Sequence, residues 1–110
     1  DPFNFQNGVI RAMLFKNIAV STTAKVQHLD AALFGRAPIC PHFVVRSSAG
    51  RGVHVRFVNP KLELDITKLL HDGTVQIPEF VFFGDLGADI YFWCDTGTAT
   101  VSVDFRVGRL

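Results

Sequence analysis

Apolar and polar residues alternate one by one along most of the chain. The last segment shows this best, with apolar residues at every second position: Ala99, Val101, Val103, Phe105 and Val107. Successive side chains of a strand point to opposite faces, so this period of two predicts a half-buried strand with one solvated face. The same alternation runs through residues 53–57 and 62–66, and the Asn59-Pro60 pair between them predicts a turn.

Five further apolar runs predict strands, at residues 9–15, 18–26, 39–46, 77–83 and 88–94. Turn residues separate these runs at short intervals, which is typical of sandwiches and jelly rolls. We therefore predict an all-β fold, a single-domain antiparallel β-sandwich that is jelly-roll-like, with about seven or eight short strands and at most one short helix.

Three stretches modify this pattern. Residues 24–34 carry apolar residues at helical spacing and end before a glycine, which predicts a short helix there. Residues 66–70 could form one helical turn. Prolines at positions 38 and 41 predict that the strand at 39–46 lies at a sheet edge, because proline cannot donate to the hydrogen-bond ladder.

Length and composition indicate one globular domain. The chain has 110 residues, of which 48% are hydrophobic and 19% charged, which excludes a disordered chain. We divide it into an N-terminal arm at residues 1–8 and a sandwich domain at residues 9–110. Phe3 and Phe5 stand two positions apart in an arm too short and polar to form its own core. We therefore expect these two rings to be buried against a neighbouring subunit.

The net charge and the cysteine count indicate which partners are not expected and whether the thiols are free. The net charge of +1 provides no overall field for nucleic acid or a membrane surface, so we expect neither as a partner. No apolar stretch approaches the roughly 18 residues of a membrane span. Two cysteines, Cys40 and Cys94, are too few for a disulfide scaffold, and their apolar surroundings favour buried free thiols over a bridge.

One short motif resembles an enzyme. Asp95-Thr-Gly-Thr98, after two apolar residues, resembles the catalytic loop of aspartic proteases, which need two carboxylates that share a proton. The chain that follows Thr98 is one strand long, without room for the flap and bracing segment of that family. We interpret the motif as a hairpin turn, in which Gly97 takes a positive φ and Asp95 accepts from the turn amides.

The histidines, cysteines and remaining aspartates do not form a pattern that predicts a cofactor or metal site. His28, His42, His54 and His71 lack metal-ligand spacing, among themselves and with the cysteines. Cys40 and His42 share a strand face but have no orienting third group or oxyanion hole, so we expect structural roles. Asp85 and Asp89 are two carboxylates in a glycine-flanked turn, too few for calcium.

The one basic stretch runs from Arg46 to Arg56, and a small-residue hairpin loop lies at its centre. Arg46, Arg51, His54 and Arg56 together could bind an anion, with loop amides beside the guanidinium groups. A solvated loop is the simpler interpretation, and an acidic patch on a neighbouring subunit is as good a partner as nucleic acid.

The segment 77–94 is apolar on both faces, whereas a small sandwich has only one inner face per sheet. Phe80, Phe82, Tyr91 and Trp93 are therefore predicted, with Phe3 and Phe5, to lie at an assembly interface. Tyr91 and Trp93 share one face and could alternatively stack on a sugar.

These observations predict a non-enzymatic structural protein that forms a symmetric homo-oligomer or coats a larger assembly. Architecture alone suggests a viral or phage shell, decoration or tail component, which would place it in a virion. The alternative is a small-ligand binding module for a sugar or an anion, with Tyr91 and Trp93 or the Arg51 loop as its site.

Overall fold

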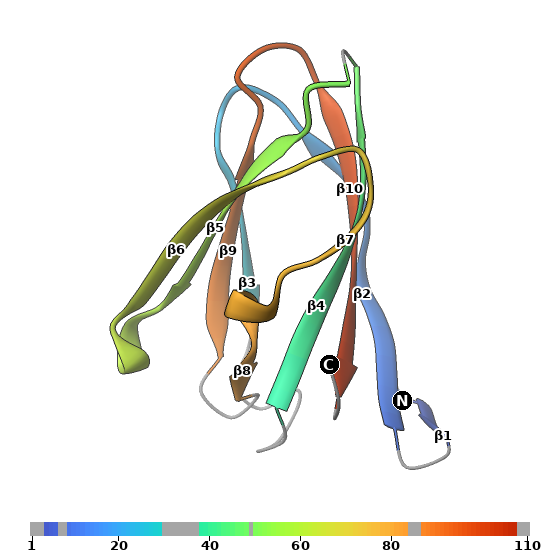
Figure 1. Ribbon diagram of the computed structural model, residues 1–110, viewed down its shortest axis with the longest axis vertical. Helices are drawn as coiled ribbons and strands as arrows, with labels where there is room; N and C mark the ends of the chain where they lie inside the picture. Colours follow the sequence, from blue (N-terminus) through green and yellow to red (C-terminus); the bar gives the residue numbers. More distant parts are fainter. Residues whose placement is uncertain (1–3, 7–8, 30–37, 49, 84–86, 108–110) are drawn as a thin grey trace.

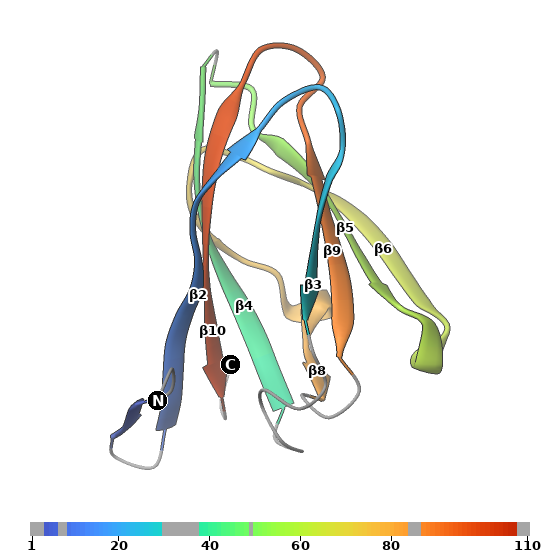
Figure 2. The same cartoon turned by 180° about the vertical axis from the view of Figure 1, so that it is seen from behind.

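The computed structural model describes residues 4–6, 9–29, 38–48, 50–83 and 87–107, with backbone alone for 4–6, 9–14, 82–83 and 107. Two antiparallel sheets face each other (Figures 1 and 2). The prediction of an all-β sandwich is confirmed. Cys40 and Cys94 are buried free thiols, as the sequence favoured. No helix within these ranges is long and apolar enough to cross a membrane.

The six-stranded sheet has the order β1-β2-β10-β4-β7, and β8 also pairs with β4. Its strands are β1 (Asn4–Gln6), β2 (Val9–Val20), β4 (Pro38–Ser47), β7 (Gly73–Gln76), β8 (Phe82–Phe83) and β10 (Ala99–Val107). The four-stranded sheet has the order β3-β9-β5-β6. Its strands are β3 (Lys25–Leu29), β5 (Val53–Asn59), β6 (Leu64–Leu70) and β9 (Ala88–Trp93).

The core lies between the two sheets and consists of the side chains that alternate inward. Phe43 of β4 lies at its centre, with its ring centroid 6.1 Å from that of Phe80 and 6.2 Å from that of Phe92. Phe80 also stacks on Phe57 at 5.2 Å. Rings from both sheets therefore interlock edge-to-face and face-to-face, the arrangements that aromatic pairs prefer.

Two short 3-10 helices, η1 (Pro60–Leu62) and η2 (Pro78–Phe80), interrupt the strands. In η1, the buried Asn59 accepts a hydrogen bond from the Lys61 amide at 3.1 Å and donates one to the Gly87 carbonyl at 3.0 Å. The predicted Asn59-Pro60 turn is confirmed, and it joins β5 to β6 as a hairpin.

Several local predictions are wrong. Within residues 24–34, residues 25–29 form strand β3, residue 24 precedes this strand, and residues 30–34 lie outside the described residues. Residues 66–70 belong to strand β6, which pairs with β5 throughout its length. In both places, pairing with a neighbouring strand outweighs the helical spacing, because an isolated helix this short is only marginally stable.

The strand around residues 39–46 is not at a sheet edge, because β4 lies between β10 on one side and β7 and β8 on the other. The sheet accommodates Pro41 because the two short partners leave a gap there: β8 pairs with residues 38–39 and β7 with residues 42–45. A proline in that gap needs no amide hydrogen for a ladder bond.

Two connections predicted as hairpins instead cross from one sheet to the other. The segment around Gly97 links β9 of the four-stranded sheet to β10 of the six-stranded sheet, and the loop around Arg51 links β4 to β5. Gly97 does have the predicted positive φ, +74°. The turn amide of Thr98, however, donates to the Ser48 hydroxyl at 3.2 Å. The predicted capping by Asp95 is replaced by a contact with the neighbouring crossover.

The prediction of a separate N-terminal arm stays a prediction. Residues 4–6 form β1, which pairs with β2 of the same chain, so that Phe5 lies opposite Ile10. The side chain of Phe5 and all of Phe3 lie outside the described residues.

Candidate binding surfaces on the two outer faces

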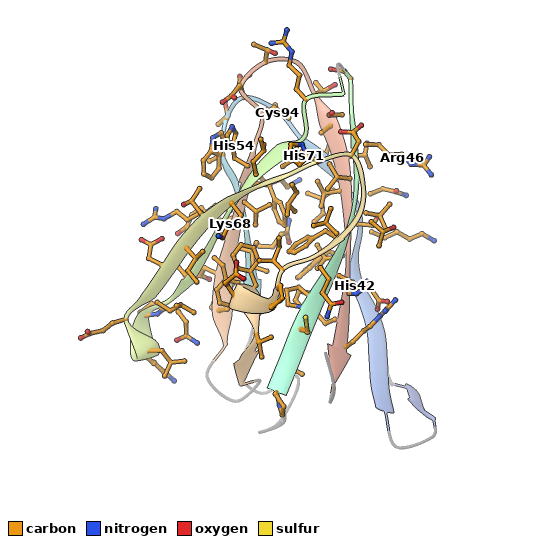
Figure 3. The ribbon with its side chains drawn as sticks, viewed as in Figure 1. His42, Arg46, His54, Lys68, His71 and Cys94 are labelled. Carbon is orange, nitrogen blue, oxygen red and sulfur yellow. The ribbon has the colours of Figure 1, made fainter. Side chains whose placement is uncertain are left out.

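The four predicted anion-binding residues do not form one site. Arg46 points outward from the six-stranded sheet, whereas His54 points outward from the four-stranded sheet (Figure 3). Arg56 alternates with buried neighbours on the same strand as His54 and shares its face. Arg51 is exposed in the crossover between the sheets. The strand crossover thus splits the basic stretch over opposite faces.

Two of the six predicted interface residues, Tyr91 and Trp93, lie on the outer face of the four-stranded sheet. Trp93 lies opposite His54, which lies opposite Leu69 on β6. In the next row, Val26 on β3 lies opposite Tyr91, and Tyr91 lies opposite Arg56. We call this set the aromatic face: Val26, His54, Arg56, Leu69, Tyr91 and Trp93.

Ring contacts organise the centre of the aromatic face. The His54 ring stacks on Trp93, with centroids 5.4 Å apart and planes 16° from parallel. The Arg56 guanidinium carbon lies 5.5 Å from the centre of the Tyr91 ring, within the range of a cation–π contact. The edges of the aromatic face are apolar and solvent-exposed, since Val26 is 49% and Leu69 42% exposed.

The charged groups of this sheet's outer face are paired with each other. Arg56 donates two hydrogen bonds to Asp65, from Nε at 2.8 Å and from Nη2 at 2.6 Å. These bonds hold the pKa of the Asp65 carboxyl below its usual value. His28 Nδ1 lies 2.5 Å from a carboxylate oxygen of Asp89, which is its partner on the neighbouring strand. Asp85, the other aspartate of the predicted turn, lies outside the described residues.

A shallow groove of about 300 Å³ crosses the aromatic face, lined by Thr22, Ala24, Arg56, Tyr91 and Trp93. It has the size of a small ligand site, and it offers two ring faces and one oriented guanidinium. Tyr91 and Trp93 share a face, as predicted, and both line this groove. The stacking His54 was not anticipated, although its alternation on β5 was the signal for it.

Other predicted interface residues do not reach the surface or are not described. Phe80 is fully buried, so its placement at an interface is wrong. The reason is η2, which starts at Pro78 and turns the ring into the core instead of continuing a strand. The Phe82 side chain lies outside the described residues.

The Asp95 carboxylate has no second carboxylate beside it among the interactions of the described residues. It is solvent-exposed, and its Oδ2 lies 2.9 Å from His54 Nε2, although the two groups are not aligned as a hydrogen bond. That geometry offers an ion pair when His54 is protonated, but not the shared proton that aspartic proteases need.

Cys40 and His42 meet through Gln76 of β7. Gln76 Nε2 donates to Cys40 Sγ at 3.1 Å, and Gln76 Oε1 lies 2.9 Å from His42 Nε2. Burial raises the pKa of the Cys40 thiol, and burial also raises that of Cys94. A protonated thiol is a poor nucleophile and metal ligand. Across the described residues, no three His, Cys, Asp or Glu side chains gather as metal ligands.

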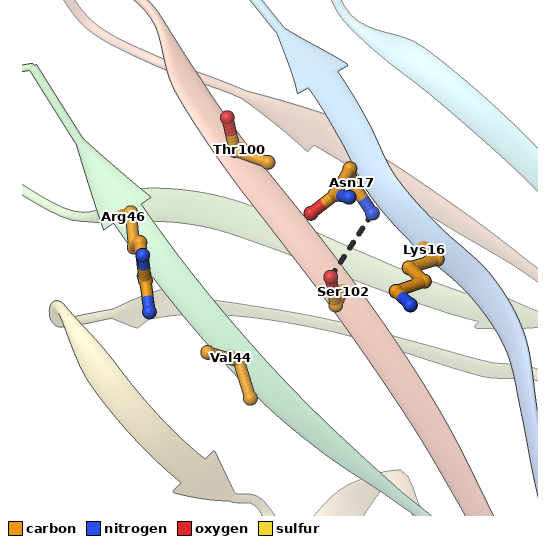
Figure 4. A pocket seen from close by; sticks show the side chains of 6 residues that line it. All are labelled: Lys16, Asn17, Val44, Arg46, Thr100 and Ser102. Atoms are coloured by element: carbon orange, nitrogen blue, oxygen red, sulfur yellow. Dashed lines mark hydrogen bonds between the residues drawn. The ribbon is translucent and has the colours of Figure 1, made fainter.

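The outer face of the six-stranded sheet carries a second depression. It was not predicted from the sequence, and only Arg46 of its lining residues was among the predicted anion-binding residues. It has a volume of about 550 Å³ and is lined by Lys16, Asn17, Val44, Arg46, Thr100 and Ser102; we call these residues the basic trough (Figure 4). The available signal was the run Phe15-Lys-Asn-Ile18, where two polar residues in succession break the alternation.

Comparisons with known proteins place the chain in no family. No protein-family model and no curated protein sequence matches it. Among solved structures, it is similar to the Drosophila NLP-core, with a TM-score of 0.49 and 14% sequence identity over 90% of this chain and 97% of that one. The NLP-core structure was described for its insight into pentamer formation and histone binding by that protein.

Proposed function

We propose that this protein is a non-enzymatic assembly domain that forms a symmetric homo-oligomer through its aromatic face. The observation that carries the proposal is that the aromatic face extends over all four strands of one sheet, and that all of its side chains except Arg56 are aromatic or apolar. Aromatic residues and arginine are enriched at the centres of protein interfaces, where unpaired charges are depleted.

The charge pairing supports this use of the face. Burying a charged side chain without a partner in an interface costs on the order of several kcal/mol, which opposes association. Arg56 already has its carboxylate in Asp65, and His54 has Asp95 at ion-pair distance. A second subunit would therefore desolvate compensated pairs and gain the burial of Val26 and Leu69 at the rim.

The narrower class of a viral or phage shell, decoration or tail component rests on analogy of architecture alone. Sedimentation of the purified protein would test it, because a shell component is expected to form particles far larger than a closed ring.

Light scattering coupled to size-exclusion chromatography tests the proposal directly. We expect a wild-type mass that is a small multiple of the chain mass, and a shift of Val26→Lys to the monomer. Leu62→Lys is the matched control, since Leu62 is 50% exposed and lies in η1, away from the aromatic face. A wild type that stays monomeric over a hundredfold range of concentration, or equal effects of the two variants, would contradict the proposal.

A binding module for a small sugar is the second candidate, favoured by the groove over Tyr91 and Trp93. The apolar faces of a sugar ring stack on aromatic rings, and Arg56 is fixed by Asp65 as a donor. Trp93 is the only tryptophan, so its fluorescence reports binding. A monomeric wild type whose fluorescence saturates with a saccharide would favour this candidate over assembly. Anion binding at the Arg51 loop stays a prediction without a further supporting contact.

A further inference from the structure

The strand β2 contains a bulge that presents two polar side chains on one face. Ile18 pairs with Val101 and Phe15 with Val103, so Lys16 and Asn17 together lie opposite Ser102. Phe15 packs inward against Phe105, with ring centroids 5.9 Å apart, and Ile18 is buried. Both residues between them are exposed. Regular alternation would have turned one of them into the core.

The bulge is held in an uncommon backbone conformation. Asn17 has a φ of +54°, one of two non-glycine residues with positive φ in the described chain. Its amide donates to the Ser102 hydroxyl at 3.0 Å, which fixes β2 against β10 at this point (Figure 4). Asparagine adopts this left-handed conformation more readily than most residues with a side chain, so the sequence suits the bulge.

The side chains around the bulge form a trough with cationic walls. Short hydroxylated residues, Thr100 and Ser102, lie on the central strand β10, and long cations lie on the flanking strands: Lys16 on β2 and Arg46 on β4 (Figure 4). None of the residues that line the trough is acidic. The nearest carboxylate along β10 is Asp104, which is buried and accepts from Arg106 Nε at 3.2 Å.

We infer that the basic trough binds a tetrahedral oxoanion, as the phosphate or sulfate group of a small ester. Lys16 and Arg46 supply two positive charges, neither paired with a carboxylate among the described residues, and the hydroxyls of Thr100 and Ser102 supply neutral donors between them. Guanidinium and ammonium groups are the usual ligands of such oxoanions. The cavity of about 550 Å³ exceeds one phosphate and leaves room for the group it esterifies.

The site lies on the sheet opposite the aromatic face, so it is independent of the proposed assembly. It also differs from the anion site predicted from the sequence, with which it shares only Arg46. Binding there can therefore succeed or fail whatever the oligomeric state of the protein.

The test is a titration of isotope-labelled protein with phenyl phosphate, inorganic phosphate and sodium chloride, at about pH 8 and constant ionic strength, followed by amide chemical shifts. We expect saturable shifts of Asn17, Thr100 and Ser102 with phenyl phosphate, weaker binding of inorganic phosphate, and none specific to chloride. Lys16→Gln and Arg46→Gln should each weaken binding about tenfold, because each removes one charge-assisted hydrogen bond. Thr100→Val should weaken it by less.

The matched control is Lys25→Gln, which removes one exposed positive charge from β3 on the other sheet and should leave binding unchanged. Amide spectra of all variants establish that they are folded. The inference is overturned if phenyl phosphate causes no saturable shifts at the trough, or if Lys25→Gln weakens binding as much as Lys16→Gln. Equal affinity for phenyl and inorganic phosphate would overturn the assignment to an ester.

Discussion

Gly52 is the position where the structure predicts the sharpest effect of a single methyl group. It ends the crossover from β4 to β5 with a φ of +81°, and its amide donates to the Ser47 hydroxyl at 3.0 Å. A Cβ added at this position would lie 2.3 Å from the carbonyl oxygen of Leu70 and 3.1 Å from its carbonyl carbon. Both atoms belong to the backbone of β6, which cannot rotate away as a side chain would.

The expected cost of Gly52→Ala has two parts. The left-handed backbone costs a residue with a side chain about 1–2 kcal/mol. Overpacking against a fixed neighbour adds about 1–3 kcal/mol. Gly50→Ala isolates the first part, because Gly50 has a φ of +64° in the same crossover but open space where its Cβ would be. Gly52→Ala should therefore lower the free energy of unfolding by about 1–3 kcal/mol more than Gly50→Ala does.

Equilibrium unfolding in urea measures this difference, with Trp93 fluorescence and far-ultraviolet circular dichroism as two probes of one transition. Protein concentration must be the same for all variants, because association raises the apparent stability of the folded state. If the two alanine variants unfold at the same urea concentration with the same slope, the close approach of Gly52 to Leu70 does not constrain the fold, and the reasoning is refuted.

Two further predictions concern carboxylates. The Ser47 hydroxyl and amide donate to Asp72, which lowers the pKa of that carboxyl; its stabilising effect is therefore present above the usual carboxyl pKa and is lost as pH falls through the lowered one. The difference in melting temperature between wild type and Asp72→Asn should be constant near neutral pH and shrink in acid, and a difference independent of pH would contradict this. Asp95→Asn should leave a folded protein and cost at most about 1 kcal/mol, since the Asp95 side chain is 75% exposed and its contact with His54 is not aligned as a hydrogen bond; a peptidase activity that is present in wild type and lost in this variant would show that the motif is catalytic.

The strands and their inner faces were predictable from the sequence. Val53, Val55 and Phe57 alternate with polar residues, and all three are fully buried. The same rule placed Tyr91 and Trp93 together on one face. Alternation succeeds because it follows from the geometry of the extended backbone itself, so a few neighbouring residues suffice to reveal it.

Partner choice was not predictable in the same way. The short turns around Gly97 and Arg51 predicted hairpins, yet both connect strands in different sheets. A turn sequence reports only that the chain reverses. Whether the next strand pairs with the last one or crosses the core depends on how much apolar surface each arrangement buries over the whole chain.

Both candidate surfaces depend on which strands pair with each other. The aromatic face requires β3, β9, β5 and β6 to pair in one register, which brings Val26, Tyr91 and Arg56 into a row. The basic trough requires β10 to lie between β2 and β4, so that Lys16 and Arg46 flank the same hydroxyls. The sequence by itself determined which side chains point out of each strand. Only the tertiary structure decided which of them meet, because pairing joins residues that are far apart along the chain.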